Sequence, residues 1–403
     1  MPGFVEITCS NATDFRTMPC GEFKTMIGLL KAASERVRFE ALEMSVGHHV
    51  NPHGVTDSAA LLDHVCWPDV VCYDWVHCML QGGVLNDETE ALLAASSVAG
   101  VTREGLQRFL ADGAWSYPQH CRNACRRLHR TFDVRRAGDD DACIKVKGTC
   151  SELLSLYGQL RFFFELKLGS LDVLHNELAS FRAVCDILDL ILAVKHGFVD
   201  IDDGADKLAA ALKRHLDLHL SVYGPAHCKP KHHWLQDVPA QIRKDRAVLD
   251  AFIIERTHLR VKALAEHVKN TTSFEQSVLS GVLTATAQRW QGESSSSGLR
   301  GRTARLPGVA GASVADAAEV LGIEVRVGDV VVRGASVAEI AACADQHGEL
   351  FLFVVPMDSV RQVTSHCDCH RKVQGLAVWR AIDAAHAVAW QQLADGTVLV
   401  LRK

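Results

Sequence analysis

The chain has 403 residues, of which 48% are hydrophobic and 23% charged, and its formal net charge is −5 at pH 7. This composition is that of an ordinary soluble chain with room for two or three cores, and it excludes a globally basic nucleic-acid-binding protein. The 14 cysteines are irregularly spaced and no signal peptide opens the chain, so we expect free thiols, an intracellular location and no secretion. No run of about 18 apolar residues occurs, which predicts no membrane span and no membrane partner.

Helices dominate the predicted elements as far as residue 292. The spacing of leucines and alanines predicts them at about residues 23–44, 87–97, 102–111, 149–168, 173–196, 205–222, 247–268 and 273–290. Residues 70–84 are expected to run from a strand into a helix. Thr102 would be the N-cap of the helix that follows it, because its hydroxyl can accept a backbone N–H.

The composition changes near residue 293. Residues 293–305 are rich in serine, glycine and arginine and are expected to form a flexible linker. Branched apolar residues then recur between glycines, for example at 323–332 and 349–355. This pattern predicts a separate, small β-rich domain over residues 306–403.

One predicted helix carries a carboxylate and an imidazole on the same face. Glu255, His258 and Lys262 are spaced by three and four residues within the helix expected at 247–268. An apolar stripe that includes Phe252 should lie beside them and face the core. Such a carboxylate can be a metal or acid–base ligand, but it can also belong to a structural ion pair or to a solvated helix edge.

Five motifs occur in an order that is similar to that in the C-terminal part of CACTA-type cut-and-paste DNA transposases. They are Asn-Pro-His-Gly at 51–54, Asp-Trp-Val-His at 74–77 with Gly-Gly at 82–83, Tyr-Gly at 223–224, Lys-Pro-Lys-His-His-Trp-Leu at 229–235, and Phe-x-x-Glu-x-x-His-x-x-x-Lys at 252–262. The resemblance covers about residues 45–270. It implies an RNase H-like fold with a helical domain inserted before the last catalytic carboxylate.

The resemblance also implies a chemistry, which is Mg²⁺-dependent DNA strand cleavage and transfer. Such a reaction uses two ions held by three carboxylates. Glu255 matches the third carboxylate and is the candidate catalytic and metal-binding residue, with Asp74, His77 and His258 as supporting residues. Only 73 residues precede Asp74, and they are expected to be loop and helix rather than strands that carry two more carboxylates. We therefore expect a pseudoenzyme that lacks most of the Mg²⁺ site.

The expected fold class is α+β and mainly α, a partial RNase H-like core with a large helical insertion and a small β-rich C-terminal domain. Residues 1–100 would form the partial RNase H-like region, and residues 101–246 the helical insertion. Residues 247–292 would form the helices that carry Glu255. The linker at 293–305 and the domain at 306–403 would follow.

Local basic patches predict DNA as the partner, which would place the protein in the nucleus. The candidate DNA-binding residues are Arg122, Arg126, Arg127, Arg130, Lys229, Lys231, His232, His233 and Lys262. On a helix the four arginines would lie on one side and neutralise phosphates, although a solvated face paired with the acidic run at 139–141 would look the same. The alternative function is a helical protein-interaction module with a C-terminal β-barrel-like reader domain and no DNA role. Protein partners or a homo-oligomer are compatible with either function.

Three histidine-containing groups have spacings that a metal can use. His215 and His219 are four residues apart on the face of Leu208 and Leu212, a spacing that can bind zinc. Half-buried histidines with hydrogen-bond partners are the commoner outcome of such a spacing. The groups at 120–129 and 366–370 combine histidines and cysteines but match no standard zinc finger.

Overall fold

The structure is a computed structural model of the whole chain. It describes residues 7–11, 18–33, 36–46, 58–112, 115–118, 146–171, 173–269, 272–292, 298–306, 309–320, 323–384 and 386–401. Helices account for 52% of the structure and strands for 23%. The strands of the C-terminal part form an antiparallel sheet. The prediction of a mainly helical protein with a β-rich C-terminal part is confirmed at this level.

The N-terminal part consists of helices, several of them short. They are α1 (Cys20–Ala32), α2 (Arg36–Val46), α3 (Ala59–Leu62), α4 (Trp67–Val70), α5 (Trp75–Met79), α6 (Val84–Ser96), η3 (Ser97–Ala99) and α7 (Arg103–Asp112). The strand expected within 70–84 is wrong, because α4 ends at Val70, residues 71–74 have no regular structure, and α5 follows. Within the described part of residues 1–100 there is accordingly no strand of an RNase H-like sheet.

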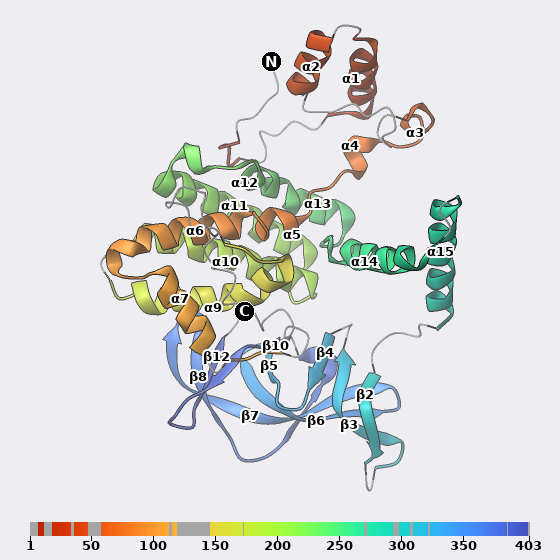
Figure 1. Ribbon diagram of the computed structural model, residues 1–403. Helices are drawn as coiled ribbons and strands as arrows, with labels where there is room; N and C mark the ends of the chain where they lie inside the picture. Colours follow the sequence, from red (N-terminus) through yellow and green to blue (C-terminus); the bar gives the residue numbers. More distant parts are fainter. Residues whose placement is uncertain are drawn as a thin grey trace.

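The longer helices follow from residue 150 onward, and those before residue 224 lie in the centre of the molecule (Figure 1). They are α9 (Cys150–Leu168), α10 (His175–Lys195), α11 (Ile201–Tyr223), α14 (Phe252–His267) and α15 (Phe274–Gly292), all within a few residues of their predicted positions except at the start of α14. Short helices connect α11 to α14, namely η6 (Pro225–His227), α12 (Pro230–Trp234), η7 (Leu235–Asp237) and α13 (Val238–Asp245). In Figure 1 α14 and α15 project sideways from this bundle, whereas α6, α9, α10 and α11 lie together.

Local sequence signals explain where the long helices begin. Thr149 precedes α9 and its hydroxyl accepts the N–H of Glu152 at 3.3 Å, while the Glu152 carboxylate accepts the N–H of Thr149 at 2.8 Å. This reciprocal capping box satisfies two backbone donors that the helix itself leaves unpaired. Asp200 caps α11 with its carboxylate, which accepts the N–H groups of the two residues after Ile201. The apolar faces of these helices then share one continuous core with α6.

The C-terminal strands belong to one antiparallel sheet. They are β2 (Gly298–Arg305), β3 (Ala312–Val320), β4 (Ile323–Arg326), β5 (Val330–Arg333), β6 (Ser336–Gln346), β7 (Glu349–Thr364), β8 (Cys367–Lys372), β9 (Ala377–Arg380), β10 (His386–Val388), β11 (Trp390–Gln392) and β12 (Val398–Leu401). The main path of the sheet is β1-β11-β12-β8-β7-β6-β3-β2, with β4, β5, β9 and β10 attached beside it. β2 is formed by residues that were expected to be part of the linker, because its backbone pairs with β3 from Arg305 opposite Ser313 to Gly298 opposite Glu319.

The sheet is attached to the helices by side chains and by one strand. β1 (Trp115–Ser116) follows α7 in the chain and pairs with β11 at the sheet edge. Phe162 from α9 packs with Trp115 and with Leu399 of β12 in a separate buried cluster between helices and sheet. The Ser365 hydroxyl also donates to the Glu165 carboxylate of α9 at 2.9 Å. Figure 1 shows the sheet directly below α7 and α9, in agreement with these contacts.

We predict that Phe162→Ala lowers the free energy of unfolding by about 3–5 kcal/mol, because the side chain is 6% exposed and its removal leaves a cavity under the sheet. Leu166→Ala is the matched control on the same helix, since Leu166 is 48% exposed. The control should change stability by no more than about 0.5 kcal/mol. Denaturant unfolding followed by circular dichroism measures both, and equal effects of the two substitutions would contradict the packing described.

Candidate functional site

The predicted Asp-x-x-His motif forms the beginning of α5 and one side of a longer-range contact. The Asp74 carboxylate accepts the N–H groups of Val76 and His77, each at 3.2 Å, and therefore caps the helix. The His77 ring is also hydrogen-bonded to this carboxylate. In addition Asp74 accepts the backbone N–H of Ala251 at 3.1 Å, from 177 residues further along the chain. Ala251 immediately precedes α14, the helix that contains Glu255.

A second contact joins the same motif to the Lys-Pro-Lys-His-His-Trp-Leu run. Tyr73 and Trp234 stack with their rings 12° from parallel and their centroids 5.7 Å apart. Gln241 of α13 secures the backbone of Tyr73, accepting its N–H at 2.8 Å and donating to its carbonyl at 3.0 Å. We call the meeting point of Tyr73, Asp74, Trp234, Gln241 and Ala251 the motif junction. The motif junction brings together three of the five motifs, which are far apart in the sequence. The contacts are made by residues of these motifs or by residues within one helical turn of them.

The Gly82-Gly83 pair has a conformational role beside this junction. Gly82 has a φ of +57°, a left-handed conformation that side-chain-bearing residues seldom adopt. At Gly83 a Cβ atom would lie 2.3 Å from the carbonyl oxygen of Cys78. Only glycine therefore allows the tight turn that carries the chain from α5 into α6.

The predicted catalytic residue lies in α14, and the backbone before this helix is held by two contacts. Asp250 pairs with Lys195 of α10 at 2.5 Å and accepts the N–H of Phe252 at 3.1 Å. Glu255 and His258 are within α14, but their side chains are outside what the structure describes. The assignment of Glu255 as a catalytic or Mg²⁺-binding residue stays a prediction.

The predicted DNA-binding residues have different environments. Arg122, Arg126, Arg127 and Arg130 lie outside the described residues, whereas Lys262 is exposed on α14. Lys229 pairs with Asp87, and Lys231 donates to the Gln81 carbonyl at 3.0 Å.

The two histidines of the same run are less accessible than a DNA-binding role requires. His233 is partly buried, and burial lowers the pKa of its ring. His232 is only 2% exposed, so the interpretation of this residue as a DNA ligand is wrong for the folded protein. The Lys-Pro-Lys-His-His-Trp-Leu run therefore has an exposed side and a buried side, and the His232 imidazole lies in the core.

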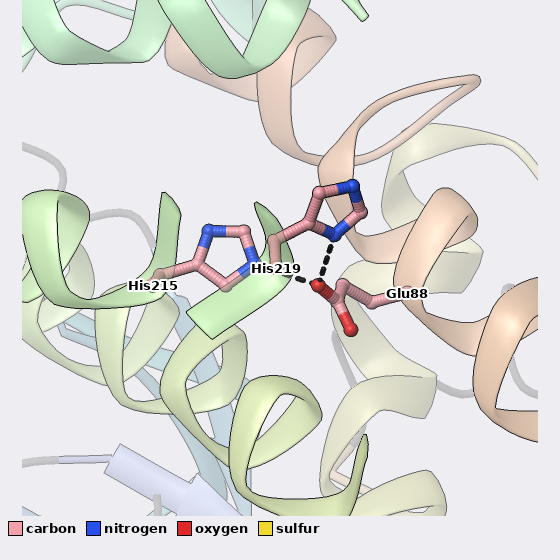
Figure 2. A group of neighbouring side chains, drawn as sticks. All are labelled: Glu88, His215 and His219. Atoms are coloured by element: carbon pink, nitrogen blue, oxygen red, sulfur yellow. Dashed lines mark hydrogen bonds and ion pairs between the residues drawn. The ribbon is translucent and has the colours of Figure 1, made fainter. Parts of the chain in front are cut away.

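The core site that receives His232 is a group of three ionisable side chains, Glu88 from α6 and His215 and His219 from α11 (Figure 2). We call it the Glu88 cluster. The three residues are 0%, 3% and 1% exposed. His215 Nε2 lies 2.8 Å and His219 Nδ1 2.7 Å from the same oxygen, Oε1 of Glu88. Figure 2 shows both imidazoles directed at this oxygen while the second oxygen points elsewhere.

Two further residues surround the Glu88 cluster. The hydroxyl of Ser180 in α10 donates to Glu88 Oε1 at 2.7 Å. The His232 ring lies 4.4 Å from the His219 ring and stacks on His215 at 5.9 Å, measured between centroids. The cluster therefore connects α6, α10, α11 and α12 in the middle of the bundle.

The electrostatics of this site follow from its burial. Burial by itself would raise the pKa of Glu88, but hydrogen bonds from His215 and His219 outweigh it and lower that pKa to about 2. The carboxylate is thus held ionised. Burial lowers the pKa of His232 to about 3, with a further contribution from the neighbouring His219 and His215, so this ring is neutral near pH 7.

The sequence indicated part of this cluster and missed the rest. The spacing of His215 and His219 was recognised as one that a metal can use, but Glu88 is 127 residues before His215 and was not connected to it. Its own helix held a signal, because Leu85 and Leu92 are three and four residues away and place Glu88 on the apolar face. Among the described residues the Glu88 cluster is the one group of three potential metal ligands. The group predicted at 120–129 lies outside the described residues.

Comparisons of this chain with protein-family models, with curated protein sequences and with solved structures found no match. The resemblance to CACTA-type transposases therefore stays a prediction from the sequence motifs. Within the part of the chain that the structure describes, no helix combines the length and the apolarity needed to cross a membrane.

We predict that Asp74→Ala destabilises the protein by about 2 kcal/mol, because α5 loses its cap and the Ala251 N–H loses its acceptor. Asp74→Asn should cost clearly less, since an amide oxygen can still cap the helix. Urea unfolding at neutral pH measures both variants. Equal losses for the two would show that the charge of Asp74, rather than its hydrogen bonds, holds the motif junction together.

Proposed function

We propose that the chain is a transposase-derived protein of the CACTA type that binds DNA and does not cleave it. The observation that carries this proposal is the motif junction. The Asp-x-x-His motif, the Lys-Pro-Lys-His-His-Trp-Leu run and the start of the Glu255 helix meet through the Tyr73–Trp234 stack and the Asp74–Ala251 hydrogen bond. Motifs that belong to one ancestral site are expected to assemble in this way, whereas unrelated matches have no reason to do so.

The surface of the motif junction has the chemistry of a nucleic-acid contact. Tyr73 and Trp234 are 36% and 37% exposed, so the edge of an aromatic stack is accessible there. Lys231 lies in the same helix as Trp234, and Lys244 is exposed on the neighbouring α13. Aromatic faces stack on bases and lysines neutralise phosphates, so this combination supports binding of single-stranded or distorted DNA.

The donor chemistry supports binding rather than cleavage. Two-metal strand transfer needs several carboxylates around Mg²⁺, which prefers oxygen ligands. The described residues assemble no group of three carboxylates, and their one candidate metal-binding group contains two imidazoles. Derivation of residues 1–100 from an RNase H-like region and a nuclear location are further parts of the proposal, and Mg²⁺ would be the ion if any cleavage activity remained.

One observation favours the alternative, a helical interaction module whose β-rich part contacts another protein. Leu376, Val378 and Ile382 are 65%, 56% and 55% exposed in and beside β9. An exposed apolar group of this kind is typical of a protein-binding surface. Salt separates the two functions, because phosphate contacts weaken with ionic strength and apolar contacts do not.

We predict that the protein binds single-stranded DNA in a fluorescence-anisotropy titration and that binding weakens steeply with salt. Lys231→Ala should reduce the slope of log affinity against log salt concentration by about 1, since one phosphate contact is lost. Lys207→Ala is the control, because this lysine is exposed and pairs with Asp203 on α11, outside the motifs. Trp234→Ala should weaken binding at every salt concentration through loss of stacking.

Two outcomes would contradict DNA binding at the motif junction. Binding that is insensitive to salt would favour the protein-interaction alternative. Equal effects of Lys231→Ala and Lys207→Ala would mean that DNA contacts the protein without using this surface.

We predict that supercoiled DNA stays intact on incubation with the protein and Mg²⁺ or Mn²⁺, because one carboxylate at Glu255 cannot hold two ions. Glu255→Ala should change the calorimetric affinity for either ion little. Glu266→Ala, an exposed carboxylate on the same helix, is the control. A large loss of tight Mn²⁺ binding in Glu255→Ala alone would reveal a more complete catalytic site.

A further inference from the structure

We propose that Glu88, His215 and His219 form a binding site for one Zn²⁺ ion that has a structural role. Two imidazole nitrogens and a carboxylate oxygen are a donor set that zinc uses in proteins. The three ligand atoms lie within 4.8 Å of one another. The proposal is independent of DNA binding, since it rests on the core of the helical bundle and not on its surface.

The spacing of the donors is close to that around a zinc ion. Ligand atoms bound tetrahedrally at 2.0–2.1 Å from zinc are about 3.3 Å apart. In the Glu88 cluster the two imidazole nitrogens lie 2.8 and 2.7 Å from Glu88 Oε1. Each pair therefore needs to separate by about half an ångström, which side-chain rotation on two packed helices can supply.

The contacts of His219 resemble those of a ligand histidine. Its Nε2 lies 3.4 Å from the carbonyl oxygen of His227, to which this nitrogen can donate. The other nitrogen, Nδ1, faces the Glu88 carboxylate at 2.7 Å and would be the nitrogen that binds the ion. A ligand histidine that donates its second N–H to a backbone carbonyl is the usual arrangement at protein metal sites.

Without an ion, the two oxygens of the Glu88 carboxylate have unequal numbers of polar contacts. Oε1 lies within 2.8 Å of three polar groups, which are the two imidazole nitrogens and the Ser180 hydroxyl. Oε2 is buried and has no hydrogen-bond partner among the described residues. Buried carboxylate oxygens are normally satisfied, and a cation bound to this group would use the unpaired oxygen as a further ligand.

His232 encloses the site but is not assigned as a ligand. Its Nδ1 accepts the backbone N–H of Lys229 at 3.2 Å, so the neutral ring carries its proton on Nε2. A nitrogen that carries a proton cannot bind zinc. The ring instead packs against His215 and His219 and excludes water from them.

The identity and the role of the ion follow from the donors and the burial. Mg²⁺ and Ca²⁺ prefer all-oxygen sites, whereas imidazole favours zinc and its neighbours in the first transition row. All three ligands are at most 3% exposed, so a substrate has no access to the ion in this conformation. The ion would fasten α6 to α11, with the Ser180 hydroxyl of α10 orienting the carboxylate.

The test measures zinc in protein produced without a histidine tag, stripped with a chelator and reloaded. We expect one Zn²⁺ per chain by mass spectrometry of the metal, a higher melting temperature with Zn²⁺, and no effect of Mg²⁺. We expect His219→Ala and Glu88→Gln each to weaken zinc binding by about a hundredfold or more, because each removes a ligand. Ser180→Ala should weaken it by about tenfold, because Ser180 only orients the Glu88 carboxylate. His64→Ala, which removes an exposed imidazole, should bind zinc like the unchanged protein.

Two results would overturn the proposal. One is a folded wild-type protein that takes up no stoichiometric zinc, which would leave the cluster as a hydrogen-bonded ion pair. The other is zinc binding of unchanged affinity in folded Ser180→Ala and His219→Ala, which would place the ion elsewhere.

If the ligand variants do not fold, the absorption spectrum of the wild-type protein loaded with Co²⁺ identifies the ligands instead. A spectrum of nitrogen and oxygen ligation agrees with the site, whereas thiolate charge-transfer bands would assign the ion to cysteines and refute it.

Discussion

The helical part of this protein is organised around a carboxylate that has no access to water. An ionised side chain in a protein core is costly unless donors or cations surround it. Glu88 is 0% exposed, and the groups that compensate it come from α10 and α11. The relative positions of these helices are thus limited to those that keep His215, His219 and Ser180 around one carboxylate. Apolar packing alone would tolerate small shifts of the helices, but this set of directional contacts does not.

The same region determines what the Lys-Pro-Lys-His-His-Trp-Leu run presents at the surface. Its imidazole at 232 turns inward against the Glu88 cluster, and Lys229 pairs with Asp87, the residue before Glu88. Burial raises the pKa of Asp87, while the hydrogen bond from Lys229 opposes that rise. With one side of the run held in the core, Trp234 is directed to the stack with Tyr73. The buried site and the motif junction therefore contact opposite sides of one short helix, α12.

The contact between the helices and the sheet is of a different kind. It consists mainly of apolar side chains such as Phe162, Trp115 and Leu399. Polar contacts add to it, such as the hydrogen bond between Ser365 and Glu165 and the approach of His366 to Asp186 at 3.7 Å. Non-directional contacts of this kind are stabilised by the area removed from water. β1 adds a two-residue backbone pairing to β11, which makes a segment following α7 part of the C-terminal sheet. The β-rich part is consequently not independent of the helices that precede it.

Sequence alone determined those features that depend on local periodicity and on local hydrogen bonding. The positions of α9, α10 and α11 follow from apolar residues at helical spacing, and capping residues such as Thr149 and Asp200 mark where two of them start. Part of the expected linker was misassigned because β2 is a largely exposed, arginine-rich strand that pairs with β3. The predicted strand before Asp74 was wrong because α4 ends only at Val70 and Asp74 already caps α5, which leaves residues 71–73 between the two helices.

Tertiary structure alone decided which of the polar residues are brought together. Glu88 and His215 are 127 residues apart, and Asp74 and the Ala251 backbone N–H are 177 apart, so no local pattern relates the groups that meet. The burial of His232 beside exposed Trp234 was equally invisible in a run that looks uniformly basic. Periodicity specifies which face of a helix is apolar, but only the packing of several helices specifies which buried carboxylate meets which imidazole.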